Sequence, residues 1–424
     1  MPYRFVHAAD IHLDSPLRSL AFRDPELAAL IGNATRRAFV AIVNLCLEEQ
    51  VDALLLAGDL YDGEQTSMKT ARFLAAQIRR LHEAAIRVFI IRGNHDSLSK
   101  ITQELVFPDS VKVFGGRAET IAVDRAKGDF PVAIHGISFK QPHAPESLLP
   151  KFKAPIEGAV NIALMHTSLA GAPGHDLYAP CNPLDLDAAG FHYWALGHIH
   201  KRAASQGACA IVMPGMPQGR DINEAGPKSV TLVTLADDRS VHLEERLTSV
   251  AQFERVAVNL EGVDAWPAMV AAIAGALEEA AGAVVSEHMV ARLSLRGATP
   301  LAWQIRRDRD LLKAEADERA SVVGKVSIER IEIDCSPPRA AGDSAADPLA
   351  DLRALIADEI AHSSAYEAAL MAMAKELQAQ LPHEARAIFG ADEDSFKAIL
   401  ARLADEGAED VLARLHARAR ESDA

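Results

Sequence analysis

Short apolar runs alternate with longer segments of helical periodicity through the first half of the chain. The runs lie in the stretches RFVHAADIH, VDALLLAGD, RVFIIRGNHD, VNIALMH and YWALGHIH. Their apolar residues are nearly continuous, which is expected of strands that are covered on both faces. Each run therefore predicts a buried strand that ends in polar residues.

Helical spacing appears between the first three runs. The segment after the first run offers a set of apolar core candidates, namely Phe39, Ile42, Val43, Leu45 and Leu47. A second helix is predicted over residues 71–82, before the third run. Strands that alternate with helices predict an α/β fold with a layered, mainly parallel sheet.

The polar residues at the strand ends are of one chemical kind. They are Asp10, His12, Asp59, Asn94, His166, His198 and His200. Ligands of such sheets bind outside the carboxyl ends of the strands, so side chains from five strand ends can converge there. A single buried histidine is more often structural than a ligand. The ordered set, with both GNHD and GHIH after strands, favours a shared site.

Oxygen donors mixed with imidazoles suit divalent first-row ions such as manganese, iron or zinc. Seven ligands are too many for one ion, so the set predicts two ions, with Asp59 as the bridging carboxylate. Paired ions activate water for in-line attack on phosphorus. His95 is then free to face a substrate, as a phosphate-stabilising group or as a general acid. Asp96 is expected to orient His95 or its loop.

Composition narrows the class of protein further. The 424 residues carry a net charge of −15 and only four cysteines, and these show no paired spacing. The cysteines argue against a disulfide framework or a structural zinc site, so we expect a cytoplasmic protein. We see no signal peptide and no run near the roughly 18 apolar residues that a membrane span needs. The acidic balance disfavours a free-standing nucleic-acid binder, although bound metals can neutralise a phosphate substrate.

The ordered motifs resemble those of the calcineurin-like metallophosphoesterases. They are DIH at residues 10–12, GDLYD at 58–62, GNHD at 93–96, the lone His166 and GHIH at 197–200. Residues 214–229, PGMPQGRDINEAGPKS, further resemble the SbcD-type DNA exonucleases and their YhaO-like relatives. The family fold would be a layered β-sandwich flanked by helices. Close relatives carry a second histidine where this chain has Asp62, and Met216 stands where a small or polar residue is expected.

The resemblance also implies roles for the site residues. One metal would be held by Asp10, His12, Asp59 and His200, and the other by Asp59, Asn94, His166 and His198. His95 would be the catalytic histidine, and manganese the usual activating ion.

The resemblance further implies a domain layout. Residues 1–238 would form the nuclease domain, 239–335 a small α+β capping domain, 336–348 a linker and 349–424 a helical tail. An arginine cluster of Arg292, Arg296, Arg306, Arg307 and Arg309 could contact a DNA backbone, or could simply pair with nearby acids.

The tail shows apolar residues at helical spacing. They are Leu349, Leu352, Leu355, Ile356 and Ile360, followed by Leu400, Leu403, Val411, Leu412 and Leu415 on one predicted face. In SbcD-type proteins the corresponding tail binds the coiled coil of an SbcC-type ATPase, and this chain has no Walker A motif of its own. A homodimer through residues 24–27 and the following helix is a further expectation.

The predicted function is a two-metal phosphodiesterase that acts on double-stranded DNA ends. It would be a 3′-to-5′ exonuclease with endonuclease activity in DNA repair, the nuclease subunit of an SbcCD-like complex. Two alternatives remain: a phosphodiesterase or phosphatase for small phosphoesters, and a largely non-catalytic subunit that tethers an ATPase to DNA.

Overall fold

The computed structural model describes residues 1–15, 25–62, 67–97, 106–123, 130–169, 178–338, 348–381, 389–390 and 392–422. The chain forms two compact units. The first comprises Met1–Leu17, Ala29–Phe253 and Val284–His288, and the second comprises Arg18–Ala28, Glu254–Ala283 and Met289–Ala424.

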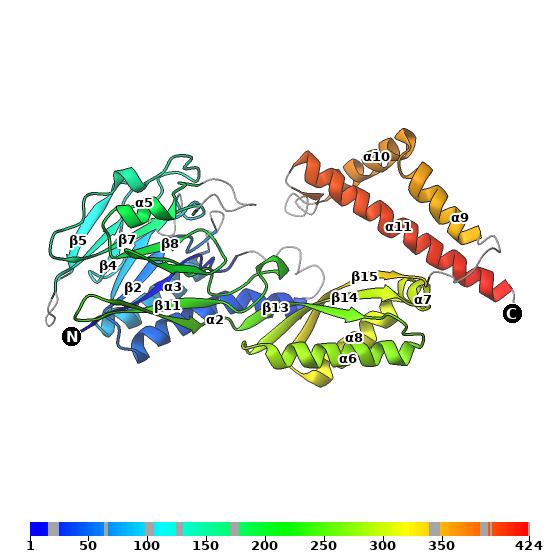
Figure 1. The fold of residues 1–424 in the computed structure, drawn as a ribbon, viewed down its shortest axis with the longest axis horizontal. Coiled ribbons are helices and arrows are strands. Elements are labelled where there is room, and N and C mark those ends of the chain that lie inside the picture. The colour runs from blue at the N-terminus through cyan, green and yellow to red at the C-terminus, as the bar shows by residue number, and fades with distance from the viewer. Residues whose placement is uncertain are drawn as a thin grey trace. The chain divides into compact units, whose positions relative to one another are not determined.

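Two six-stranded sheets build the first unit (Figure 1). The first sheet has the order β12-β11-β1-β2-β3-β4, with bounds Val241–Leu247, Ser229–Leu235, Tyr3–Ala8, Ala53–Ala57, Arg87–Ile91 and Val111–Val113. The second has the order β5-β6-β7-β8-β10-β9, with bounds Glu119–Val123, Val132–Gly136, Val160–His166, Tyr193–Gly197, Ala210–Met213 and Ala203–Gln206. Neighbours from β1 to β4, and from β6 through β8 to β10, run parallel. The remaining pairs of neighbouring strands in these two sheets run antiparallel.

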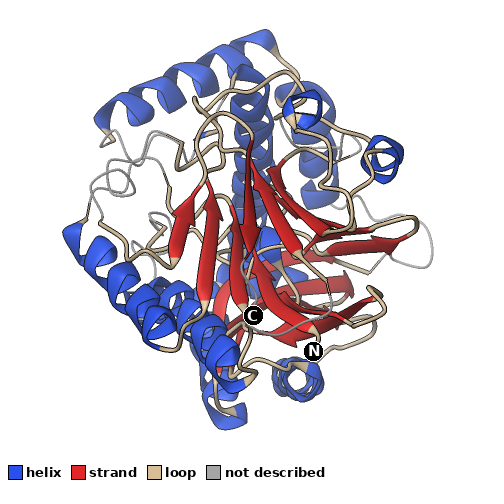
Figure 2. Cartoon of the chain, turned by 90° about the vertical axis from the view of Figure 1, so that its left-hand side faces the viewer, coloured by secondary structure: helices blue, strands red, loops and turns tan. Residues whose placement is uncertain are grey.

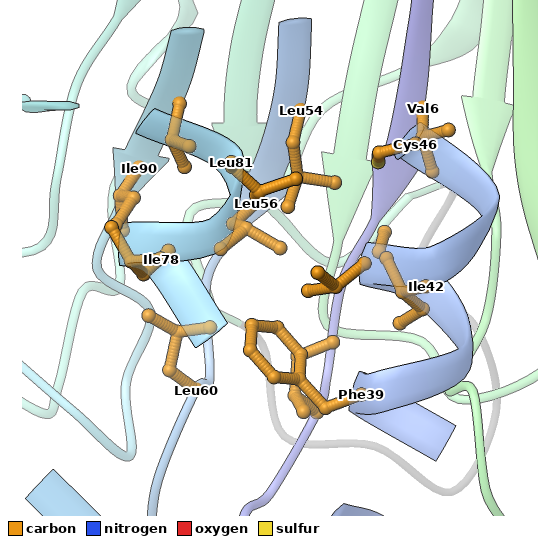
Figure 3. Packing of buried hydrophobic residues seen from close by; sticks show 14 of the residues in the cluster. Val6, Phe39, Ile42, Cys46, Leu54, Leu56, Leu60, Ile78, Leu81 and Ile90 are labelled. Atoms are coloured by element: carbon orange, nitrogen blue, oxygen red, sulfur yellow. The ribbon is translucent and has the colours of Figure 1, made fainter. Parts of the chain in front are cut away.

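Both faces of the central strands β1, β2 and β3 are buried, as their near-continuous apolar sequences require. On one face, helices α2 (Pro25–Glu48) and α3 (Met68–Glu83) cover them. Phe39 and Ile42 of α2 and Ile78 of α3 point at Leu54 and Leu56 of β2 (Figure 3). The apolar residues at helical spacing in α2 and α3 therefore pack against the sheet.

The other face of the first sheet packs on the second sheet. Phe5, Leu55 and Phe89 meet Ile162 and Tyr193 in one buried cluster. Figure 2 shows the strands of the chain in red and its helices in blue. A third cluster covers the outer face of the second sheet. It includes the short helix α5 (Pro183–Ala188). The predicted α/β fold with a layered β-sandwich flanked by helices is confirmed.

The second unit begins with a three-stranded sheet of β13 (Ala251–Asn259), β14 (His288–Ala298) and β15 (Val326–Ser336). Its helices are α6 (Trp266–Ala283), α7 (Ala302–Arg307) and α8 (Arg309–Val323). The Trp266 indole nitrogen donates to Glu315 at 2.9 Å and so joins α6 to α8. β14 and β15 run parallel, which a crossover through α7 and α8 permits.

The C-terminal part of this unit is helical. It contains α9 (Pro348–Leu355), the π-helical turn η3 (Ile356–Ile360), α10 (Ser364–Gln380) and α11 (Glu393–Ser422). Most of the predicted linker, residues 339–347, lies outside the described residues, as does Asp24 of the predicted dimer contact.

The division between the two units differs from the predicted one. The strand at 241–247 was expected in the capping domain, but it pairs with β11 along its whole length. The two units therefore divide at Phe253. The sequence of an edge strand does not indicate which sheet it joins, because its hydrogen-bond partner is a strand elsewhere in the chain.

The predicted apolar face of the last helix is wrong in part. Leu400 and Leu412 are buried, whereas Leu403, Val411 and Leu415 are exposed. The arginine cluster is paired within the chain. Its ion pairs are Arg292 with Glu329 and Glu332, Arg296 with Asp334, Arg306 with Glu409, Arg307 with Asp308, and Arg309 with Asp410. These contacts favour the alternative of a paired surface.

Among the described residues, α2 alone is long and apolar enough to cross a membrane, by length and composition only. A core helix passes the same test, and Phe39, Ile42 and Val43 of α2 are fully buried against the first sheet.

Candidate active site

Loops from both sheets meet at the carboxyl ends of their central strands. Asp10 and His12 follow β1, Asp59 follows β2 and Asn94 follows β3, all in the first sheet. His166 ends β7, while His198 and His200 follow β8, in the second sheet. The loops are tied together directly, since the His198 amide donates to Asp10 Oδ1 at 3.1 Å across the two sheets.

The backbone at this site is strained. Asp10, His12, Asp59 and His198 have φ values of 53°, 45°, 53° and 105°. Such left-handed conformations are costly for residues with a side chain, and they persist where the surrounding structure enforces them, often at functional sites. Here the turn directs each side chain toward the shared centre.

Glycines in the motifs make room for the ligands. A Cβ on Gly93 would lie 2.3 Å from Asp59 Oδ1 and 2.7 Å from His166 Nε2. A Cβ on Gly58 would lie 2.4 Å from His166 Nδ1, and one on Gly197 would lie 2.1 Å from the Ala57 carbonyl oxygen. The glycines at positions 58, 93 and 197 are therefore required by close approach.

One half of the site centres on two imidazoles. His12 Nδ1 donates to Asp62 at 2.7 Å, and His200 Nδ1 donates to Glu224 at 2.8 Å. These carboxylates fix the tautomers, so that the Nε2 lone pairs of both rings face inward. The two Nε2 atoms lie only 3.2 Å apart. Two lone pairs at that distance need a proton or a cation between them.

The other half centres on His166. Its Nδ1 donates to the Ala57 carbonyl at 2.9 Å, so Nε2 faces the site. Nε2 lies 3.0 Å from Asn94 Oδ1 and 3.3 Å from Asp59 Oδ2. The His198 ring lies 5.3 Å from the His166 ring, centroid to centroid. Again, electron-rich atoms converge on one small volume.

The donor set fits divalent ions in two neighbouring positions. Asp59 Oδ2 faces His166 Nε2 and also lies 4.0 Å from His12 Nε2, which places this carboxylate between the two halves. Ligand atoms lie within 4.8 Å of one another in three groups: Asp10 with His12 and His200, Asp10 with Asp59 and His166, and His12 with Asp62 and His95. Mixed carboxylate and imidazole donors without thiolates are typical of catalytic divalent sites.

His95 lies at the rim. Its side chain is 45% exposed, and its Nδ1 lies 3.2 Å from Asp62 Oδ1. The hydrogen bond to Asp62 raises the pKa of His95, although partial burial opposes the shift. The imidazolium form is therefore favoured at an atom that can reach an incoming substrate. Asp62 orients both His12 and His95.

Asp96 holds the loop that follows β3. Among the described residues, its side-chain hydrogen bonds go to backbone amides and not to His95. Its carboxylate accepts from the Gly93 amide at 2.7 Å and from the Leu60 amide at 3.0 Å, which joins two motif loops. Burial raises the pKa of Asp96 to about 7, and the nearby Asp59 charge acts in the same direction. The loop role, one of the two that were predicted, is what the structure shows.

Burial and neighbouring charge shift the pKa values of His166 and Asp59 in opposite directions. Burial alone would lower the pKa of His166, but the Asp59 carboxylate outweighs it and raises the pKa to about 9. Burial would likewise raise the pKa of Asp59, but the charge and hydrogen bond of His166 hold it below its ordinary value. Without an ion, a proton on His166 neutralises this pair.

Two strand histidines outside the predicted set have structural partners. His7 lies 2.9 Å from the Tyr193 hydroxyl and 3.1 Å from the Leu196 carbonyl. His135 lies 2.8 Å from Asn161 Oδ1. Both rings are buried in sheets and satisfied there.

Sequence reasoning missed two contributors, Arg220 and Glu224. Both lie in the stretch PQGRDINE, which was noted only for its resemblance. The signal available was a charged pair spaced i, i+4 in a glycine-bounded segment. That spacing indicates a local ion pair but gives no hint of contact with His200.

The fold and the donor set define a metal-dependent phosphoesterase domain. Residues 3–202 match the family model described as calcineurin-like phosphoesterase. Residues 3–202 are thus similar to the calcineurin-like phosphoesterases, as the motifs predicted. Residues 253–336 match the model of the middle domain of the metallophosphoesterase YhaO.

Two curated proteins are similar to part of this chain. The chain is 34% identical over 257 residues to a Bacillus subtilis (strain 168) protein named uncharacterized metallophosphoesterase YhaO, covering 60% of this chain and 63% of that protein. It is 29% identical over 210 residues to the DNA double-strand break repair protein Mre11 of Methanocaldococcus jannaschii, covering 47% of this chain and 51% of that protein. The chain thus matches between half and two thirds of the length of these relatives.

A solved dimetal phosphatase from Danio rerio is a weaker likeness. It shares 11% identity, and the match covers 59% of this chain and 99% of that one with a TM-score of 0.34. A score this low supports no argument about the site.

Proposed function

We propose that the chain is a two-metal phosphodiesterase that degrades DNA from its ends, as a 3′-to-5′ exonuclease with endonuclease activity in DNA repair. The observation that carries the proposal is the meeting of carboxylate, amide and imidazole donors from both sheets around Asp59. Likeness to proteins named for DNA double-strand break repair favours DNA as the substrate. The polarity rests on the resemblance to SbcD-type nucleases alone.

Two divalent ions, proposed as manganese, would be held by the seven donors. The list is Asp10, His12, Asp59, Asn94, His166, His198 and His200. When bound, such ions neutralise phosphate charge and activate water. The protein's own part is to fix the donors in place and to keep Asp59 between the two halves.

His95 is proposed to act directly on the substrate. Asp62 holds Nδ1 of His95, so the Nε2–H of the imidazolium is left to donate to a phosphate oxygen or to the leaving oxygen. The exposed position of the ring allows a long polymer to approach it. General acid catalysis of this kind contributes roughly 10²- to 10⁴-fold to the rate.

The test is nuclease activity with added manganese. End-labelled linear double-stranded DNA and bis-p-nitrophenyl phosphate are offered to the wild type, to His95→Ala and to His82→Ala. His82 is an exposed histidine that contacts Ser110 at 2.9 Å and serves as the matched control. We expect loss of the DNA label with the wild type and the control, and a fall of about 10²-fold or more with His95→Ala.

Other outcomes would redirect the proposal. Hydrolysis of the small ester with intact DNA favours the small-phosphoester alternative. Loss of neither substrate, with manganese still bound, favours the tethering alternative. Equal activity of His95→Ala and wild type would contradict the role of His95.

We also propose that the C-terminal helices bind the coiled coil of an SbcC-type ATPase. Large apolar side chains on α10 and α11 support this, since Met373, Leu377, Leu403 and Val411 are 68%, 52%, 45% and 53% exposed. Apolar positions on a helix face are suited to a helical partner. A cytoplasmic location is proposed in addition, because the four cysteines are buried and unpaired.

A further inference from the structure

A partly buried ion pair lies directly behind the histidine half of the site. Glu224 Oε1 accepts from His200 Nδ1 at 2.8 Å, and the same oxygen lies 2.8 Å from Arg220 Nη2. The second oxygen of Glu224 accepts from the Arg220 backbone amide at 2.7 Å. Only 11% of the Glu224 side chain and 20% of the Arg220 side chain are exposed.

The pair is also connected to the loops that follow β1 and β2. Arg220 Nη1 donates to Ser15 Oγ at 3.3 Å and lies 3.9 Å from Asp62 Oδ1. Asp62 in turn holds His12. One guanidinium thus faces both carboxylates that fix the imidazoles of His12 and His200.

The local backbone is built to deliver Glu224. The segment passes through the short 3₁₀ turn η2 (Ile222–Glu224), whose start is capped by Asp221 accepting from the Asn223 amide at 2.7 Å. A Cβ on Gly219 would lie 2.7 Å from the Glu224 carbonyl oxygen, so a glycine is needed there. Gly215, with φ +74°, lets the chain pass close to the His200 carbonyl.

Burying two charges is costly, and an ion pair of this kind is often no more stabilising than apolar residues. A function that needs the carboxylate at His200 explains why the charges are kept. Carboxylates that accept from the far nitrogen of a metal-binding histidine fix its ring and increase its basicity.

We propose that Arg220 and Glu224 are positioning residues that hold His200 for the metal site, with Arg220 acting through Glu224. This rests on the proposed function, because it assumes that His200 binds a metal ion. In this proposal neither residue contacts the substrate, so their effect is carried by the affinity of one metal position.

The test measures metal binding without any substrate. Metal-free wild type, Glu224→Gln and Arg220→Lys are titrated with Mn²⁺ by calorimetry, and their metal-free unfolding temperatures are recorded. Glu224→Gln should weaken one of two Mn²⁺ sites by about 10- to 100-fold and leave the other unchanged. Arg220→Lys keeps the charge but loses the planar fork, so it should weaken the same site by a smaller factor.

The control is Glu119→Gln. Glu119 pairs with Lys112 at 2.6 Å in the same unit but contacts no predicted ligand, so its loss should leave both Mn²⁺ sites intact. If Glu224→Gln does not fold, Glu224→Asp replaces it. That variant keeps the charge beside Arg220 but draws the carboxylate back from His200, and it should weaken the same site.

The outcomes separate this inference from the proposed function. A wild type that binds no Mn²⁺ contradicts both. A wild type with two sites, and Glu224 variants with the same two affinities, overturns only the positioning role. Lower unfolding temperatures with unchanged Mn²⁺ affinities would show that the pair is merely structural.

Discussion

His166 and Asp59 compete for the same small volume that a divalent ion would occupy. The oxygen of Asp59 lies 3.3 Å from His166 Nε2, and a proton there relieves the repulsion when no ion is bound. A metal ion needs the neutral ring, so binding must release this proton. The Asp59 carboxylate, which would attract a cation, therefore also makes metal binding at this site sensitive to pH.

Mn²⁺ affinity should rise with pH. Because Asp59 raises the pKa of His166 to about 9, the ring is protonated at neutral pH and loses its proton only above that value. Below a pH of about 9, apparent affinity should increase about tenfold per pH unit for each proton displaced. Calorimetric titrations at several pH values, in buffers with different ionisation enthalpies, measure both the affinity and the proton release. An affinity independent of pH would contradict this arrangement.

Asp62→Asn should shift the pH profile of catalysis. The hydrogen bond to the Asp62 carboxylate is the main cause that raises the pKa of His95, so its loss lowers that pKa toward the ordinary value. If protonated His95 donates to the substrate, the basic limb of kcat/KM moves to lower pH. Hydrolysis of bis-p-nitrophenyl phosphate at saturating Mn²⁺ measures the profile, with Glu119→Gln as a variant that should not move it. A basic limb that stays in place would remove His95 from the role of proton donor.

At the scale of single elements, the turns after β2, β3 and β8 do most to form the site. Each turn begins with a glycine whose missing side chain leaves space for the Asp59 carboxylate, the His166 ring or the Ala57 carbonyl. A strand can therefore end abruptly, and the next residue can turn its side chain into the centre.

Gly93→Ala should abolish metal binding at the Asn94 half of the site. The added methyl group would lie 2.3 Å from Asp59 Oδ1, so the carboxylate and the loop must move apart. Overpacking of this kind costs roughly 1–3 kcal/mol in the free energy of unfolding. Gly275→Ala is the control, because Gly275 lies in α6 with nothing within 4 Å of an added Cβ. It should stabilise the protein by about 0.5–1 kcal/mol. Urea unfolding and Mn²⁺ titration report both effects, and normal Mn²⁺ binding by Gly93→Ala would contradict the close approach.

At the scale of the whole molecule, α11 is joined to the rest of the second unit in part through charged groups. Arg309 lies 2.8 Å from Asp410, and Arg306 and Arg330 lie 3.8 Å from Glu409 and Glu406. Apolar side chains are left on the surface of the same helix. One side of α11 therefore contacts the rest of its unit, and another side exposes apolar residues that a partner could contact.

Leu403→Ser combined with Val411→Ser should weaken binding to the coiled coil of an SbcC-type ATPase. Both side chains are about half exposed, so their loss removes a contact surface without opening a core cavity. We expect at least a tenfold loss of affinity, which corresponds to about 1.4 kcal/mol, and an unchanged unfolding temperature. Val285→Ser, at an apolar residue of the first unit that is 59% exposed, is the control. Equal binding by the double variant and the control would remove these helices as the docking surface.

The sequence by itself determined the elements and the chemistry of the site. Apolar periodicity marked β1, β2, β3, β7 and β8, and the residues after them supplied Asp10, Asp59, Asn94, His166 and His198 with their chemical types. These features follow from interactions between near neighbours in the chain, where strand formation, turn formation and the need for glycine are decided.

Only the tertiary structure decided which distant segments meet. The five strands are divided between two facing sheets, β12 joins the first sheet, Glu224 reaches His200, and α11 pairs with Arg306 and Arg309. The periodicity of a strand is the same in either sheet, and an acid has the same local pattern whether it faces water or an imidazole. These choices depend on which apolar faces bury each other, and that is settled by the packing of the whole chain.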